Sequence, residues 1–300
     1  MGRDRSADRL GGRPAVRSFH HSAFPVERVR DERTGTISVC ILARECEETI
    51  EPIAATMTGL RGAGAVDEVI VVDAASHDAT ATLAERAGAE VRQEAELAPE
   101  HGPVLGKGDA MWRALPTLTG DVVCFIDGDS TDAGAHYACG LAGAVACEPG
   151  VRFAKAFYRR PFRIGDTVLA QGGGRVNELT ARPLLARFYP ELAAVRQPLA
   201  GEVAARRDLL ERLPFATGYA VEIAMLIDAY REVGLEALSQ VDLDVRQNAH
   251  QPLDALSPMA GAVLSAVTAR LAREGRLVDA GEGAVVERPP VASLGASGRS

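Results

Sequence analysis

The chain has 300 residues, a length that fits one large α/β unit or two smaller domains. Hydrophobic residues make up 47% of the sequence and charged residues 25%, which excludes a low-complexity or disordered chain. The formal net charge of −8 argues against a protein that binds nucleic acid through a basic surface. An acidic chain that binds an anion needs a local site made of a few Lys or Arg side chains, backbone N–H groups or a metal ion.

The spacing of the cysteines and the length of the apolar stretches indicate the cellular compartment. The five cysteines include no C-x-x-C pair, which indicates free thiols in a reducing compartment rather than a disulfide framework. No apolar stretch approaches the roughly 20 residues of a membrane helix, and none follows the N-terminal arginines as in a secretory signal. We therefore expect a cytoplasmic protein without a membrane span.

Strands and helices alternate through the first half of the chain. Short β-rich runs predict strands, and apolar residues at helical spacing predict helices between them. We expect strands at residues 36–42, 66–73, 121–127 and 151–158, and helices at 47–60, 76–87, 107–118 and 134–147, with Ser76 as an N-cap. This alternation is typical of βαβ units and a mostly parallel sheet.

The alternation weakens in the second half. Gly-rich loops lead into helices expected at residues 175–188, 219–233 and 252–274, with a strand-like run at 237–245. The sequence thus predicts an α/β domain with helices on both faces of its sheet over residues 17–160, and an α-rich lobe over 161–274. Residues 1–16 are predicted to be a disordered segment, and 275–300 a flexible tail.

Polar residues that follow an apolar strand are candidate site residues, because ligands of parallel sheets bind beyond the carboxyl ends of the strands. The sharpest example is Asp127-Gly128-Asp129. Two carboxylates on a turn, with a glycine between them, can chelate a hard divalent cation. Alternatively, Asp127 caps the strand end and Asp129 caps the next helix.

Lys107 lies between Gly106 and Gly108 at a predicted helix start. The glycines let the backbone approach a ligand, and both the ammonium group and the helix N-terminus favour an anion. The spacing is not that of a P-loop, and a surface turn is the alternative interpretation.

A second candidate anion site is the run Gly172-Gly173-Gly174-Arg175, which opens another helical pattern. Backbone N–H groups and one guanidinium would bind a phosphate or a carboxylate. A flexible hinge is the alternative.

Two further polar positions remain ambiguous from spacing alone. Glu222 interrupts an apolar helical run and faces either a pocket or solvent. His250, in Asn248-Ala249-His250, follows the strand-like run, and a single histidine is usually a satisfied surface or core residue.

Together these motifs resemble the retaining GT-A glycosyltransferases of the glucosyl-3-phosphoglycerate synthase family. The similarity extends over residues 19–270, and the combination is far more specific than any one motif. Its segments are F-H-H-S-x-F-P (19–25), V-D-E-V-I-V-V-D (66–73), G-K-G-D-A-M-W (106–112), D-G-D (127–129), K-A-F-Y-R-R-P (155–161), G-G-G-R-V-N-E-L-T-A-R-P-L-L (172–185), Q-P-L-A-G-E (197–202), G-Y-A-V-E-I (218–223) and Q-V-D-L-D-V-R (240–246).

The resemblance implies a GT-A, Rossmann-like fold and transfer of a hexosyl unit, normally from UDP-glucose, to the 2-hydroxyl of 3-phosphoglycerate. It also implies Mg²⁺ or Mn²⁺ as cofactor and a homodimer. Catalytic roles fall to Glu222, Asp129 and Lys107. The implied donor-binding residues are Ala43, Glu45, Glu47, Asp73, Ser76, Lys107, Asp127, Gly128 and Asp129. The acceptor-binding residues are Gly173, Gly174, Arg175, Asn177 and Asn248, and the metal ligands are Asp127, Asp129 and His250.

Several ligand-facing positions depart from the family pattern. Residues 42–47 read L-A-R-E-C-E where P-A-L-N-E-E or P-A-R-N-E-E is common, and 73–78 read D-A-A-S-H-D where D-S-G-S-T-D is common. Both loops line the nucleotide pocket in the family, so these changes leave the base and the donor open. Asn177 stands where Thr is usual. Changes confined to such positions indicate altered substrate choice on a retained framework.

The late H-R-N of the family appears here as Asn248-Ala249-His250, which moves the histidine by two residues. Either the loop shifts and His250 still binds the metal, which we favour, or Asn248 binds it through the amide oxygen and His250 faces the acceptor.

Three other functions compete with this hypothesis. The first is a related glycosyltransferase of specialised metabolism, which uses a GDP- or other NDP-sugar and a different acceptor. The second is a sugar nucleotidyltransferase, which should carry a G-x-G-T-R-type loop that Glu45-Cys46-Glu47-Glu48 does not resemble. The third is a binding protein with a degenerate site, which the retained Lys107, Arg175 and Glu222 argue against.

Overall fold

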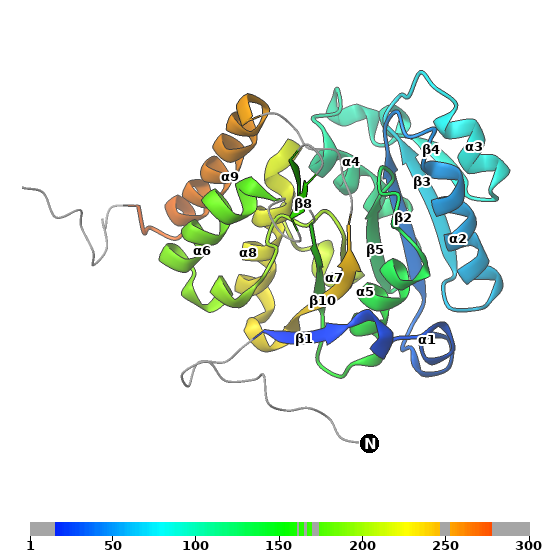
Figure 1. Cartoon of the computed structure of the whole chain (residues 1–300), viewed down its shortest axis with the longest axis horizontal. Coiled ribbons are helices and arrows are strands. Elements are labelled where there is room, and N and C mark those ends of the chain that lie inside the picture. Colours follow the sequence, from blue (N-terminus) through cyan, green and yellow to red (C-terminus); the bar gives the residue numbers. More distant parts are fainter. Residues whose placement is uncertain (1–15, 161, 165–166, 170–173, 247–252, 278–300) are drawn as a thin grey trace, which may run out of the picture.

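A computed structural model describes residues 16–160, 162–164, 167–169, 174–246 and 253–277 (Figure 1). Within this part of the chain, eight strands form one sheet in the order β1-β10-β6-β9-β5-β2-β3-β4. They are β1 (Arg17–His20), β2 (Ile37–Ala43), β3 (Glu68–Asp73), β4 (Glu90–Gln93), β5 (Val122–Asp127), β6 (Phe153–Arg159), β9 (Val203–Arg206) and β10 (Leu238–Val245). Only β9 is antiparallel to its neighbours, so the expected mostly parallel sheet is confirmed. A separate hairpin joins β7 (Phe162–Ile164) to β8 (Thr167–Leu169).

Helices cover both faces of the sheet (Figure 1). One face packs against α1 (Val26–Glu32), α2 (Ile50–Gly62), α3 (Thr80–Arg86) and α5 (Ala135–Cys147). The other packs against α4 (Lys107–Ala114), α6 (Arg182–Phe188), α7 (Arg207–Leu210), α8 (Val221–Val233) and α9 (Leu253–Arg273). Side chains alternate across a strand, so each central strand needs apolar residues on both faces. In β2, Val39 and Ile41 accordingly enter one core, and Cys40 enters the other.

Each expected strand and helix has a counterpart, with ends shifted by a few residues. One detail is wrong: α3 begins at Thr80, and the Ser76 hydroxyl donates a 2.5 Å hydrogen bond to Asp73 instead of capping the helix. The helix expected over 175–188 is divided into a π-helical turn, Asn177–Ala181, and α6. Pro183 accounts for this division, because it has no N–H for a helical hydrogen bond.

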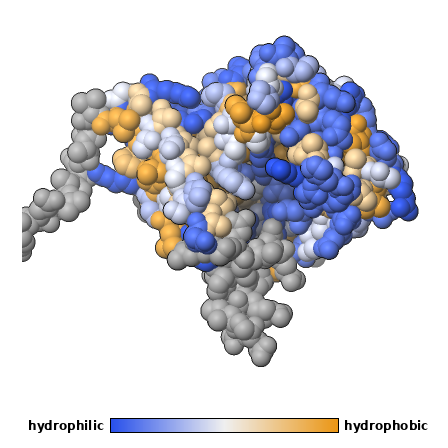
Figure 2. Space-filling model, turned by 90° about the horizontal axis from the view of Figure 1, so that it is seen from above, coloured by the Kyte–Doolittle hydropathy of each residue, from blue (hydrophilic) through white to orange (hydrophobic). Residues whose placement is uncertain are grey.

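The structure also contains elements that the sequence analysis did not expect. Besides short 3₁₀ turns, these are β1, β4, β9, the hairpin, α1 and α7, all of seven residues or fewer. Both β9 and β10 come from the predicted C-terminal lobe, so residues 161–274 complete the central sheet as well as supplying helices. Seen from above, hydrophobic residues gather on the left, over α6 and α9, and the right side is mostly hydrophilic (Figure 2). The segments 1–15 and 278–300, predicted to be disordered or flexible, lie outside the described residues.

Two expectations about hydrophobicity and cysteine can be compared with the structure. Over Asp254–Arg273, α9 is long and apolar enough to span a membrane by length and composition, so the expectation that no such stretch exists is wrong. This helix nevertheless packs on α8, where Arg270 pairs with Asp228 at 2.5 Å. The five cysteines are free thiols, as predicted, and burial raises the pKa of Cys40 and Cys124 well above the ordinary value.

Arg113 of α4 holds the segment that follows β4. Its side chain is buried and donates to the carbonyl groups of Leu97 and Ala98 at 2.9 Å and of Gly102 at 2.8 Å. Its Nε is 3.1 Å from the carboxylate of Asp109, one helical turn earlier. One buried cation thus anchors the loop that leads into the N-terminus of α4.

Arg113→Met should lower the free energy of unfolding by about 3 kcal/mol, because it leaves a buried carboxylate without its partner and several carbonyls without a donor. Arg212→Met is the matched control, since Arg212 forms exposed ion pairs with Asp208 and Glu232 and should cost less than about 1 kcal/mol. Urea denaturation measures both variants. Equal losses would contradict the anchoring role.

Candidate active site

The carboxyl ends of β2, β5 and β10 open onto a cavity of about 520 Å³. This volume lies within the range of about 300–1,000 Å³ that is usual for small-molecule sites. The N-terminal ends of α4 and α8, residues 174–178, residues 197–201 and α9 complete the walls. Candidate donor and acceptor residues therefore share one cavity, including Ala43, Lys107, Asp127, Asp129, Gly174, Arg175, Asn177 and Glu222.

Lys107, the first residue of α4, lies between two carboxylates. Its Nζ is 2.5 Å from Asp127 Oδ1 and 3.1 Å from Glu222 Oε1. Burial alone would lower the pKa of Lys107, but the charges of Asp127 and Glu222 raise it above the usual value, so the ammonium stays charged. Glu222 therefore faces the cavity, and its alternative placement toward solvent is wrong.

Arg246, directly after β10, bridges the two aspartates of the D-G-D turn. Its Nη2 is 3.4 Å from Asp127 Oδ2 and 3.1 Å from Asp129 Oδ1. Its Nη1 pairs with the buried Glu202 and donates to the Tyr158 hydroxyl at 2.9 Å. Burial would raise the pKa of Asp127, but the charges of Lys107 and Arg246 hold it well below the ordinary range.

The Asp127 and Asp129 pair fits a hard divalent cation. Both carboxylates already converge on one cationic group, and carboxylate oxygens are preferred ligands of Mg²⁺ and Mn²⁺. The Asp129 side chain is 63% exposed, which leaves room for water ligands. Among the described residues, no third His, Cys or carboxylate completes a cluster here. Asn248 and His250, the predicted additional ligands, lie outside the described residues, as does Gly173.

Gly201 lies directly against the Asp127–Lys107 ion pair. A Cβ atom at this position would lie 2.1 Å from Asp127 Oδ2 and 2.6 Å from Lys107 Nζ. Both distances are shorter than real Cβ contacts, so any other residue here would displace the Asp127 or the Lys107 side chain. Two residues directly before β9 thus have separate roles. Gly201 leaves space for the ion pair of Lys107 and Asp127, and Glu202 pairs with Arg246.

The candidate acceptor residues form the opposite part of the cavity wall. Gly174 has a φ of 72°, in the left-handed region that favours glycine, and Arg175 follows it on the lining. Asn177 is buried, and its Oδ1 accepts a hydrogen bond from the Leu199 backbone at 3.3 Å. Its Nδ2 donates to the Arg196 carbonyl at 3.2 Å, so this side chain also holds the wall together.

Several predicted donor residues do not line the cavity. The carboxylates of Glu45 and Glu47 accept hydrogen bonds from the backbone N–H groups of His77 (3.0 Å) and Ala79 (3.2 Å). Asp73 is buried and accepts from Ser76, so these groups connect the two predicted donor loops to each other. Gly128 packs its backbone on β2 through a 2.8 Å hydrogen bond to Leu42. Contact of Glu45, Glu47, Asp73, Ser76 and Gly128 with a donor stays a prediction.

Sequence reasoning missed Arg246, Glu202 and Glu94. Arg246 carries the same signal as Asp127, a polar residue directly after an apolar strand, and could have been found by that rule. Glu94 follows the four-residue strand β4, and Glu202 precedes the equally short β9. Strands of that length show no periodicity, so nothing local indicates Glu94, and only the family segment 197–202, which ends at Glu202, indicates the second carboxylate.

Comparisons with known proteins agree with this architecture. Residues 38–137 match the family model described as glycosyl transferase family 2. The glucosyl-3-phosphoglycerate synthase of Petrotoga mobilis is 40% identical over 267 residues, which cover 87% of this chain and 82% of that protein.

Solved structures are similar as well. The crystal structure of mannosyl-3-phosphoglycerate synthase from Rubrobacter xylanophilus has a TM-score of 0.80 at 47% identity and covers 87% of this chain and 83% of that one. Glucosyl-3-phosphoglycerate synthase from Mycobacterium tuberculosis, in complex with Mn²⁺, UDP and glucosyl-3-phosphoglycerate, has a TM-score of 0.76 at 40% identity, with coverages of 85% and 87%. Another structure of that protein contains Mg²⁺ and UDP.

Gly201→Ala should weaken Mn²⁺ binding by about 10- to 100-fold, because the added methyl group displaces Asp127 from Lys107 and disturbs the support of a ligand. Mn²⁺ titration followed by electron paramagnetic resonance measures this affinity. Gly261→Ala is the matched control, since a Cβ there meets no atom within 4 Å. Unchanged Mn²⁺ affinity in Gly201→Ala would contradict the role of this glycine.

Proposed function

The chain belongs to the glucosyl-3-phosphoglycerate synthase family, and we propose that it transfers a hexosyl unit from a nucleotide sugar to 3-phosphoglycerate with retention of the anomeric configuration. The observation that carries the proposal is the single cavity between the carboxyl ends of the strands and α9. It contains an ion-paired D-G-D turn at one side and the Gly174–Arg175 loop at the other. A donor diphosphate and a small anionic acceptor need these two kinds of group within one enclosed space.

We assign donor binding to the side of the cavity that holds Lys107, Asp127 and Asp129. The Lys107 ammonium and the N-terminus of α4 attract the donor diphosphate. Bound Mg²⁺ or Mn²⁺ would neutralise the charge that develops on the diphosphate as it leaves. Asp127 and Asp129 would bind that ion, with His250 or Asn248 as the proposed further ligand.

Glu222 and Arg175 complete the proposed assignment. The Glu222 carboxylate lines the cavity 3.1 Å from Lys107, a position suited to stabilise positive charge on the sugar while its own charge is balanced. The Arg175 guanidinium and the backbone of Gly174 would bind the acceptor phosphate or carboxylate. Action in the cytoplasm as a homodimer stays a prediction from the family resemblance.

The decisive experiment incubates the purified protein with UDP-glucose, 3-phosphoglycerate and Mg²⁺ and identifies the product by mass spectrometry and NMR. We expect a product with the donor's anomeric configuration, and excess EDTA should abolish its formation.

Asp129→Asn should lower kcat/KM by at least about 100-fold, because a bound metal contributes several kcal/mol to the transition state. Asp132→Asn, three residues along the chain and outside the cavity lining, should retain activity. Full turnover in EDTA would refute the metal requirement, and failure with every nucleotide sugar would refute the function.

GDP-mannose is a second candidate donor, and one observation in the cavity favours a guanine base. Glu94 and Arg44 both line the cavity, and although burial raises the pKa of Glu94, the charge of Arg44 acts against this shift and favours the carboxylate. Guanine offers two neighbouring N–H donors to a carboxylate and two acceptors to a guanidinium. Uracil offers a single N–H between two carbonyls, so a carboxylate can accept only one hydrogen bond from it. The identity of 47% to the mannosyl-3-phosphoglycerate synthase structure is consistent with this alternative.

Glu94→Gln distinguishes the two donors. If guanine binds here, this variant should raise KM for a GDP-sugar about tenfold or more, because a hydrogen bond to a charged group contributes about 1.5–3 kcal/mol. KM for UDP-glucose should stay unchanged. Glu96→Gln, in the same turn but outside the lining, is the matched control. An equal effect on both donors would show that Glu94 does not select the base.

A further inference from the structure

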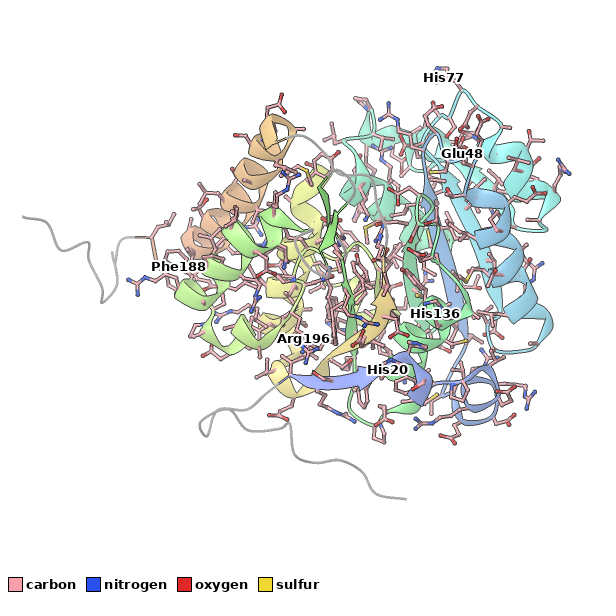
Figure 3. All side chains as sticks on the ribbon, in the orientation of Figure 1. His20, Glu48, His77, His136, Phe188 and Arg196 are labelled. Carbon is pink, nitrogen blue, oxygen red and sulfur yellow. The ribbon has the colours of Figure 1, made fainter. Side chains whose placement is uncertain are left out.

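A second group of metal-ligating side chains lies outside the cavity, in the F-H-H-S segment that the proposed function does not use. His20, His21 and Asp244 each offer one ligand atom, and these atoms lie within 4.8 Å of one another. None of the three belongs to the described cavity lining. Figure 3 labels His20 at the end of β1 and His136 at the start of α5 in the same region of the molecule, and the His136 ring contacts that of His21.

The fold brings these residues together from opposite ends of the sequence. The edge strand β1 pairs in parallel with β10, with His20 opposite Asp242. The register of β10 against β6 shifts between Asp242 and Val245, and Asp244 within this bulge has a φ of 68°. A non-glycine residue rarely adopts this left-handed conformation, and a bulge turns a side chain away from its regular direction. Here the carboxylate meets the two histidines.

Both oxygens of Asp244 contact an imidazole nitrogen. Its Oδ2 is 2.7 Å from His21 Nε2, and its Oδ1 is 3.3 Å from His20 Nε2. Arg159 is also near, with Nη2 3.4 Å from Oδ1, and is the competing cation. The other ring nitrogen of His20, Nδ1, accepts a hydrogen bond from the Ser22 backbone N–H at 3.2 Å and lies 2.8 Å from the Ser22 hydroxyl, so both groups fix the orientation of the imidazole.

We propose that His20, His21 and Asp244 bind a divalent cation of the zinc class. Two imidazoles and one carboxylate are a ligand set for Zn²⁺ or Co²⁺, and bond lengths of about 2.1 Å at tetrahedral angles place ligand atoms about 3.4 Å apart. One ligand atom from each residue already lies within 4.8 Å of the others, so a modest contraction of the cluster reaches that spacing. His20 and Asp244 are nearly half exposed, so an ion can enter and a water molecule can complete the coordination.

The bound ion would join the edge strand to β10 two residues before Arg246. That arginine bridges Asp127 and Asp129, so the cation would hold the strand end that supports the candidate active site. His136 forms a neighbouring wall, with its ring centroid 4.8 Å from that of His21. This proposal rests on His20, His21 and Asp244 alone, and it does not depend on which nucleotide sugar the protein binds.

The test uses the full chain without an affinity tag and Co²⁺ as the probe, in saturating Mg²⁺ to occupy Asp127 and Asp129. We expect one equivalent of Co²⁺ with the intense visible absorption of four- or five-coordinate cobalt. His21→Gln and Asp244→Asn should each weaken Co²⁺ binding by more than about 100-fold, since even the loss of an outer partner costs about 10- to 100-fold. Asn tolerates the left-handed backbone at position 244, so that variant should fold.

Two controls locate the ion. His101→Gln, outside the cluster, should bind Co²⁺ like the parent protein, and so should the double variant Asp127→Asn/Asp129→Asn. Circular dichroism of each metal-free variant checks the fold. Three results would each overturn the proposal. The parent protein would bind no Co²⁺ in saturating Mg²⁺, the double variant would lose the bound Co²⁺, or His21→Gln and Asp244→Asn would both keep the parent's Co²⁺ affinity.

Discussion

The balance of buried charge at the carboxyl end of the sheet governs the rest of the site. Asp127, Glu202 and Glu222 are largely withdrawn from water, and a buried carboxylate is costly unless a cation is close. Lys107 and Arg246 supply that compensation, each by contacting more than one carboxylate. Because Lys107, Arg246 and Asp127 each have more than one charged partner, replacing any of these three leaves another group uncompensated. These shared contacts explain why Gly201, the start of α4 at Lys107 and the end of β5 at Asp127 lie against one another.

The antiparallel strand β9 makes this arrangement possible. It lies between β5 and β6, and the residues that lead into it pass directly beneath the D-G-D turn. A strand parallel to β5 would begin at the opposite edge of the sheet, so the residues before it, Gly201 and Glu202, would lie far from that turn. The second half of the chain therefore contributes to the sheet and to the walls of the cavity, and its division from the first half into an acceptor lobe stays a prediction.

Much of the fold and the centre of the site could be predicted from the sequence. Long apolar runs and helical periodicity mark β2, β5 and α5, and the rule that ligands bind beyond strand ends points to Asp127, Asp129 and Lys107. Short strands such as β1 and β9 could not be predicted, because four residues show no period and depend on partners far away in the chain. No periodicity indicates Glu202 either, and only the family segment 197–202, which ends at this residue, could have indicated it. Arg246 was accessible and was overlooked.

The pairing order of the sheet has a consequence for how the chain folds during synthesis. The strands β2, β3, β4 and β5 pair among themselves, and all lie before residue 128. In contrast, β6 has only β9 and β10 as neighbours, and β1 pairs with β10 alone. The N-terminal strand must therefore wait for more than 200 residues of later chain, and contacts of such sequence separation slow folding. An emerging chain would display β1 and β6 as unpaired edges, which makes the ribosome-bound intermediate a natural client for chaperones.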